Sequence, residues 1–163
     1  MLTEELRGAL RGRVAVVGVG DAQRGDDAAG PAVAGMLAEA GVENVIDSGA
    51  SPEIETWRIR EIAPDTVLFV DAVDFGGAPG DVGILAPDNL RSTGFDTHRA
   101  PLKLTMEYLE RELGCVCRLL AIQPRDVRQG SPLCEEVRQS AENLAEMLAE
   151  HLRARSESGE RYG

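Results

Sequence analysis

The chain has 163 residues, of which 43% are apolar and only 4% aromatic, and its formal net charge at pH 7 is -11. The length indicates one domain, large enough to bury a core without disulfides. The acidic balance argues against nucleic acid or an anionic membrane surface as partner, and no apolar run approaches the roughly 20 residues of a membrane-spanning helix. Residues 2–13 are charged rather than signal-like, so we expect a cytoplasmic protein. We also expect it to be a monomer.

The first quarter of the chain predicts a helix, a strand, a glycine turn and a second helix. Leucines at four-residue spacing over residues 2–10 predict a short amphipathic helix. The β-branched run at 14–17 predicts a strand buried on both faces, and Gly18 and Gly20 allow a sharp turn after it. Helical composition then continues over about residues 27–40. In open α/β sheets such turns form the binding crevice.

A second strand and a further helix are predicted next. Residues 42–46 are strand-like, and Ser51 followed by Pro52 is typical of a helix start. The helix that begins there is expected to turn three apolar side chains toward the sheet, namely Ile54, Trp57 and Ile62.

The second half of the chain continues the alternation. Strands are predicted at 66–70 and 82–85, the latter antiparallel at an edge. A stripe of Leu102, Met106, Leu109 and Leu113 predicts a helix over 101–113, and 116–122 predicts the last strand. Ser131 and Pro132 are expected to cap the final helix.

Alternation of strands and helices with short links predicts an α/β fold. We expect a three-layer α/β/α sandwich with a mostly parallel, roughly five-stranded twisted sheet. The single domain spans residues 1–163, with 1–12 as an N-terminal extension and 153–163 as a polar tail.

The glycine turn is poorly suited to a nucleotide. A dinucleotide fingerprint needs glycine at the sixth position of its motif, and that position is Gln23. Phosphate would also have to approach Asp21, Asp26 and Asp27. A crevice that presents acids suits a cation or proton transfer better. The alternative is that Asp26 or Asp27 only caps the helix.

Three polar residues stand where predicted elements begin or end. Asp27 follows the first strand, Asp71 follows the third, and His98 precedes the helix over 101–113. Because parallel strands end on one side of the sheet, the two acids are expected to converge. Two carboxylates and an imidazole suit a borderline divalent cation, and paired carboxylates also suit acid–base catalysis, so both interpretations remain open. His98 is equally compatible with a structural role in its loop.

Other polar candidates have simpler interpretations. Asp47, at the end of the second strand, is a candidate fourth member of this set, or a turn acid that binds nearby backbone N–H groups. Cys115 and Cys117 share one face of a predicted strand, and Cys134 makes the count odd, which indicates reduced thiols. We interpret the pair as small buried hydrophobes rather than a metal-binding C-x-C.

Six segments, in the right order over about residues 13–125, resemble the hydrogenase maturation endopeptidases, and most closely the protease of the formate-hydrogenlyase type. They are Gly18 to Asp21, Gly25 to Pro31, Asp47 to Glu53, Val70 to Ala72, Thr97 to Leu102 and Ile122 to Pro124. The resemblance implies an enzyme that removes the C-terminal extension from the large-subunit precursor of a nickel-iron hydrogenase after nickel insertion. It implies metal contacts at Asp27, Asp71 and His98, with Asp27 and Asp71 catalytic.

Three positions depart from the family pattern. Asp21 replaces the usual Asn after the second glycine, Ala28 replaces a usual Gly, and Arg125 displaces Asp126 from its place after Gln-Pro. We interpret these changes as bearing on substrate preference more than on chemistry.

The sequence leaves the mechanism and part of the function open. Nickel supplied by the precursor, rather than held permanently by the enzyme, is the expected recognition signal, and hydrolysis is either aspartic-type or metal-assisted. The alternatives are a non-catalytic nickel-binding chaperone that docks on the precursor and a nucleotide-binding module, which Gln23 and the acids disfavour.

Overall fold

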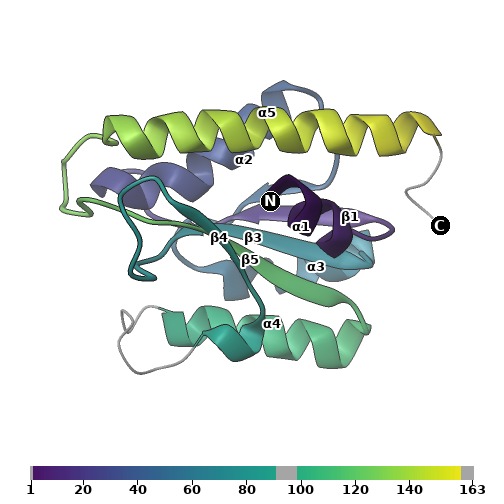
Figure 1. The fold of residues 1–163 in the computed structure, drawn as a ribbon. Helices are drawn as coiled ribbons and strands as arrows, with labels where there is room; N and C mark the ends of the chain where they lie inside the picture. The colour runs from purple at the N-terminus through teal and green to yellow at the C-terminus, as the bar shows by residue number, and fades with distance from the viewer. Residues whose placement is uncertain (1, 91–98, 159–163) are drawn as a thin grey trace.

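A computed structural model describes residues 2–90 and 99–158 and shows a sheet between two layers of helices (Figure 1). The five strands lie in the order β2-β1-β3-β5-β4, and all are parallel except β4, which pairs antiparallel with β5 at the edge. The α/β/α sandwich is therefore confirmed. The strands are β1 (Val14–Gly18), β2 (Val45–Asp47), β3 (Thr66–Ala72), β4 (Val82–Leu85) and β5 (Val116–Ile122).

The helices divide between the two faces of the sheet (Figure 1). One face carries α1 (Leu2–Ala9), α2 (Ala29–Glu39) and α5 (Glu135–Ser158). The other carries α3 (Thr56–Ile62) and α4 (Arg99–Leu113). Short 3₁₀ turns precede α2 and α3 and follow β4; they are η1 (Gly25–Ala28), η2 (Pro52–Glu55) and η3 (Pro87–Asn89).

Two apolar cores lie on either side of the sheet, because successive strand residues point to opposite faces. In β3, Leu68 and Val70 pack against the layer of α1, α2 and α5. Val67 and Phe69 pack against the layer of α3 and α4, and alternation directs Asp71 to that same side. Every residue of β1 and β3 is buried, as the uninterrupted apolar runs predict.

The predicted orientation of the helix after β2 is wrong. Ile54 and Trp57 are exposed, whereas Ile59 is fully buried and Ile62 packs against the core. The chain forms the 3₁₀ turn η2 before α3 begins at Thr56, and three residues per turn instead of 3.6 shift the phase of every later side chain.

The predicted boundaries of the last helix are also wrong. α5 begins at Glu135 rather than at Ser131, and it continues to Ser158 through the first part of the expected polar tail. Arg155 explains the extension in part, since its guanidinium donates hydrogen bonds to the carbonyl oxygens of Leu10 (3.1 Å) and Gly12 (2.8 Å).

Candidate active site

The candidate site lies at the edge of the sheet where β1, β3 and β5 end, which we call the carboxyl edge. β1 leaves the sheet at Gly18, which pairs with Val70 of β3. The Val19 N–H then donates to the Val70 carbonyl at 2.8 Å, so the turn after β1 stays fastened to β3. Gly20 continues the turn with φ +143, and a Cβ there would lie 1.9 Å from the Asp27 carbonyl oxygen.

Gly30 lets the first turn of α2 approach both central strands. A Cβ on Gly30 would lie 2.2 Å from the Val19 carbonyl oxygen and 2.4 Å from that of Val70. No side chain fits those distances without movement of the backbone. The absence of a side chain at Gly30 therefore brings η1, which carries Asp27, against β3.

Asp27 closes the glycine turn instead of capping α2. Its Oδ2 accepts a hydrogen bond from the Asp21 N–H at 2.7 Å, and neither η1 nor α2 has a side-chain cap at its start. The simple capping interpretation is therefore wrong for both Asp26 and Asp27. Asp27 as a residue is partly exposed.

Asp71 lies one residue beyond Val70 in β3 and is 0% exposed. It pairs with Ala121 of β5 and so stands in the middle of the sheet, beside the turn that follows β1. Taking a carboxylate out of water is costly, and a folded chain rarely keeps one at such a place without a role. The structure thus places Asp71 at the carboxyl end of β3 and Asp27 in η1, which contacts β3.

The other two residues predicted for the site are His98 and Asp47, and the structure bears on them differently. His98 lies outside the described residues, so its part in the site stays a prediction. Asp47 is exposed, and its Oδ1 accepts from the Gly49 N–H at 3.0 Å, which confirms the turn interpretation. Within residues 2–90 and 99–158, no three His, Cys, Asp or Glu side chains group as a metal site; the predicted trio needs His98.

Sequence reasoning missed the structural role of Asp26, which is 0% exposed. Its Oδ2 accepts from the N–H groups of Arg125 (2.7 Å) and Asp126 (3.0 Å), and its Oδ1 accepts from that of Cys134 (2.7 Å). Burial alone would raise the pKa of Asp26, but these three donors outweigh it and hold the pKa below its ordinary value. Asp26 therefore fastens the loop after β5 to the turn that carries Asp27.

Gln123 was recognised as part of a matching segment, but its role follows only from the contacts. Its Oε1 accepts from the N–H groups of Phe75 (2.9 Å) and Gly77 (3.0 Å), and its Nε2 donates to Asp74 Oδ1 at 3.0 Å. That donor, followed by the Gly76 N–H, lowers the pKa of Asp74. Gln123 thus organises the loop after β3.

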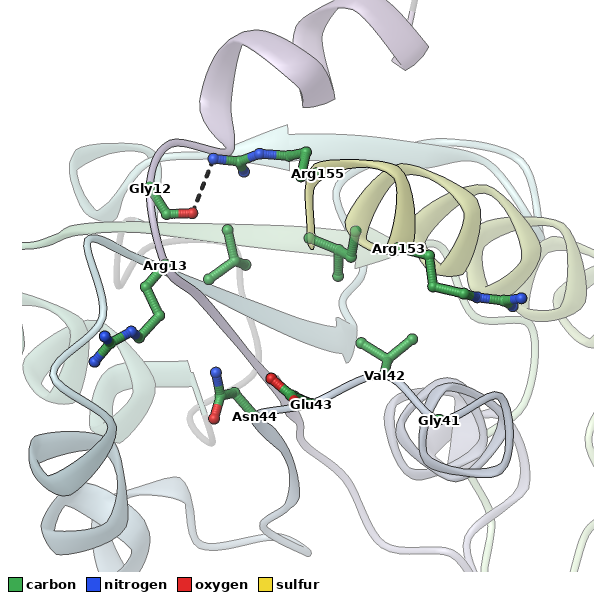
Figure 2. Close-up of a pocket in the computed structure, with 10 residues that line it drawn as sticks. Gly12, Arg13, Gly41, Val42, Glu43, Asn44, Arg153 and Arg155 are labelled. Atoms are coloured by element: carbon green, nitrogen blue, oxygen red, sulfur yellow. Dashed lines mark hydrogen bonds between the residues drawn. The ribbon is translucent and has the colours of Figure 1, made fainter. Parts of the chain in front are cut away.

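A cavity of about 120 Å³ lies at the opposite edge of the sheet, where β1 begins (Figure 2). Its lining includes Arg13, Arg153 and Arg155, yet these do not converge. Arg155 is bound to the Gly12 carbonyl, and Arg13 and Arg153 extend in different directions (Figure 2). Arg13 also donates to the Ile62 carbonyl at 2.7 Å. We assign Arg13 and Arg155 to structural contacts.

The cysteines are all reduced. Cys115 and Cys117 are buried on one face with their sulfur atoms 4.0 Å apart, which confirms their role as core residues.

The chain has clear relatives in both sequence and fold. A family model described as "hydrogenase maturation protease" matches residues 32–151. A hydrogenase 3 maturation protease of Escherichia coli is 36% identical over 133 residues, which cover 80% of this chain and 85% of that protein.

Solved structures agree with the sequence match. The crystal structure of a nickel-iron hydrogenase maturation protease from Thermococcus kodakarensis has a TM-score of 0.84 at 32% identity, covering 93% of this chain and 98% of that one. The solution structure of an endopeptidase from Escherichia coli has a TM-score of 0.75 at 31% identity, covering 85% and 90%. The chain belongs to the hydrogenase maturation protease family. In the described part of the chain, no helix is long and apolar enough to cross a bilayer.

Proposed function

We propose that the protein is an endopeptidase that removes the C-terminal extension from the large-subunit precursor of a nickel-iron hydrogenase, and that bound nickel in the precursor is the recognition signal. The observation that carries the proposal is that Asp71 lies at the carboxyl end of β3 while Asp27 lies in η1, which contacts β3 at the same edge of the sheet. In open α/β sheets this is where ligands bind. Membership in the maturation protease family supports the reaction type.

Nickel enters this proposal as part of the substrate. Asp27 and Asp71 supply carboxylate oxygens and His98 supplies an imidazole nitrogen, a mixed set suited to a borderline divalent ion. Two carboxylates and one imidazole leave coordination positions open for ligands from the precursor. The enzyme therefore recognises a precursor that already holds its metal, and it need not bind nickel tightly when alone.

Hydrolysis requires a base to take a proton from water and an acid to protonate the leaving amine. A carboxylate at the site accepts the water proton while the water oxygen attacks the scissile carbonyl. The same proton, or one held by the second carboxyl group, passes to the amine nitrogen as the C–N bond breaks. The partner acid or the substrate's nickel stabilises the oxyanion. The aspartic-type and metal-assisted routes both use Asp27 and Asp71.

Processing of a purified nickel-loaded precursor, followed by intact mass measurement, tests the proposal. The Asp27→Asn and Asp71→Asn variants should each lose at least about 100-fold in rate, the lower range for loss of a general acid or base. Asp47→Asn is the matched control, because Asp47 is an exposed acid at the carboxyl end of β2, where its side chain makes only a local turn contact with the Gly49 N–H.

Three outcomes would contradict the proposal. A wild-type processing rate in the Asp71→Asn variant would contradict the catalytic role assigned to Asp71. An unchanged precursor mass with the wild-type protein would indicate a nickel-binding chaperone instead. Equal processing of nickel-free and nickel-loaded precursor would show that nickel is not the recognition signal.

A further inference from the structure

Three large apolar side chains are exposed on the face formed by η2, α3 and α4. Ile54 is 65% exposed, Trp57 58% and Leu104 67%, and these are the exposed large hydrophobic side chains of the described residues. A single exposed apolar residue is ordinary, but a group that includes a tryptophan is typical of a binding surface. We call Ile54, Trp57 and Leu104 the apolar patch.

The three residues come from elements that contact one another. α4 packs against both η2 and α3, and the Arg60 guanidinium of α3 donates to the Tyr108 hydroxyl of α4 while lying over its ring. Trp57 lies about one turn before Arg60, and Leu104 lies one turn before Tyr108. Since both residues are exposed and each lies about one turn before a residue of this contact, helical spacing puts the two on the same outer surface of the α3–α4 layer.

The apolar patch lies toward the carboxyl edge. η2 and α3 follow the carboxyl end of β2, and α4 leads into the amino end of the parallel strand β5. Both helices therefore begin near the carboxyl edge and run away from it. Ile54, Trp57 and Leu104 all belong to the first part of their elements, and Asp71 is directed to the same side of the sheet. The patch is thus on the flank of the candidate active site.

The rim of the patch is acidic. Glu53, Glu61 and Glu107 are exposed beside Ile54, Trp57 and Leu104 respectively. The neighbouring cations Arg58 and Arg60 are engaged with Glu55 (3.2 Å) and Tyr108, and Lys103, which is partly exposed next to Leu104, is outnumbered by the three acids. The chain as a whole carries -11. The complementary partner therefore presents an apolar segment with basic residues beside it.

We infer that the apolar patch is the docking surface for the protein substrate, which places an apolar segment flanked by Lys or Arg on Ile54, Trp57 and Leu104 while its chain end enters the site at the carboxyl edge. This inference rests on the proposed function for the identity of the substrate. A docking surface outside the site supplies affinity that a short chain end cannot, and it selects a folded precursor over other polypeptides.

The test measures binding separately from cleavage. The full chain carries Asp71→Asn to prevent turnover, and its single tryptophan is replaced by 5-fluorotryptophan, so that Trp57 gives one ¹⁹F signal. We expect this signal to shift on addition of nickel-loaded precursor. Leu104→Glu should raise the dissociation constant at least about tenfold, whereas the control Gln139→Glu should leave it unchanged. Gln139 is exposed on α5, on the other face of the sheet, and its substitution adds the same charge.

The same variants in the active background separate the two proposals. Leu104→Glu should raise KM for the precursor at least about tenfold with kcat unchanged. Unaltered KM and binding in both Leu104→Glu and Trp57→Ala, with normal wild-type processing, would overturn the docking surface and leave the proposed function intact. Failure of the wild-type protein to process the precursor would instead reject the function. A wild-type dimer that Leu104→Glu converts to a monomer would assign the patch to self-association and overturn the inference.

Discussion

Asp26 and Cys134 are 108 positions apart, and the Cys134 N–H donates a hydrogen bond to Asp26 Oδ1 at 2.7 Å. The other carboxylate oxygen accepts from the N–H groups of Arg125 and Asp126. One buried side chain therefore positions the loop between β5 and α5. Because Asp26 precedes Asp27 directly, the same residue holds this loop beside the candidate active site.

Asp26→Asn should destabilise the protein by about 2–4 kcal/mol, because an amide group cannot accept from three N–H donors without directing its own N–H at one of them. Chemical denaturation measures the change in the free energy of unfolding. Asp47→Asn is the control, since Asp47 is exposed and accepts one local hydrogen bond; it should change the stability by no more than about 0.5 kcal/mol. If Asp26→Asn lowers the free energy of unfolding by less than about 0.5 kcal/mol, the structural role assigned to Asp26 is contradicted.

The stability contributed by Asp26 should depend on pH. Its pKa is lower in the folded protein than the ordinary value of 3.8, so the unfolded chain binds the proton more readily. The contribution is fully present above the unfolded-state pKa and is lost as the pH falls from there through the lowered folded-state pKa. The gap in stability between wild type and Asp26→Asn should be constant above about pH 5 and should narrow below about pH 4. A gap that widens on acidification would reverse the assigned sign.

Gly30 and Gly35 of α2 offer a matched pair. A Cβ at Gly30 would meet two carbonyl oxygens at 2.2 and 2.4 Å, whereas a Cβ at Gly35 meets nothing within 4 Å. Gly30→Ala should lower the free energy of unfolding by at least about 1–3 kcal/mol. It should also reduce processing, because the turn that carries Asp27 must move. Gly35→Ala should raise the stability by up to about 1 kcal/mol through helix propensity. Thermal and denaturant unfolding compare the two, and equal effects would contradict the close-packing argument.

Local patterns predicted most of the architecture but not the features that depend on distant contacts. The strand at 116–122 and the helix stripe of Leu102, Met106 and Leu109 were correct, because apolar periodicity is set by the buried face itself. The start of α5 could not be read locally, since the Cys134 N–H is bound by an acid 108 positions away.

For the candidate site and its surroundings as well, some features were predictable from the sequence and others were not. The position of Asp71 follows from strand order, because parallel strands end on one side of the sheet, whereas that of Asp27 also depends on Gly30, which brings η1 against β3. The exposure of Ile54 and Trp57 was missed because a 3₁₀ turn and an α-helix have different periods. These two residues have the composition of a core face, and the phase set by η2 turns them outward.

Gln123→Glu should raise the pKa of Asp74. In the wild-type protein the Gln123 Nε2 donates to Asp74 Oδ1, and this donor is the main cause that lowers the pKa of Asp74. The substitution replaces that donor with a negatively charged acceptor. The anionic form of Asp74 therefore loses a stabilising hydrogen bond and is repelled by the new carboxylate. Carboxyl ¹³C NMR titration of both proteins measures the change. Asp81→Asn is the control because its carboxylate instead accepts from the Ala78 N–H. An unchanged Asp74 titration in Gln123→Glu would contradict the assigned contact.

The last prediction concerns the two histidines of the chain, His98 and His151. If the neutral imidazole of His98 contacts nickel, protonation competes with the metal, and the processing rate should fall as the pH drops below about 6.5. His151→Gln should keep the wild-type profile, because His151 lies on α5, on the face of the sheet opposite to α4. His98→Asn should instead lose processing over the whole pH range. A wild-type rate that stays flat from about pH 8 to about pH 5 would exclude the ligand role, because no imidazole at its ordinary titration range could then be required in its neutral form.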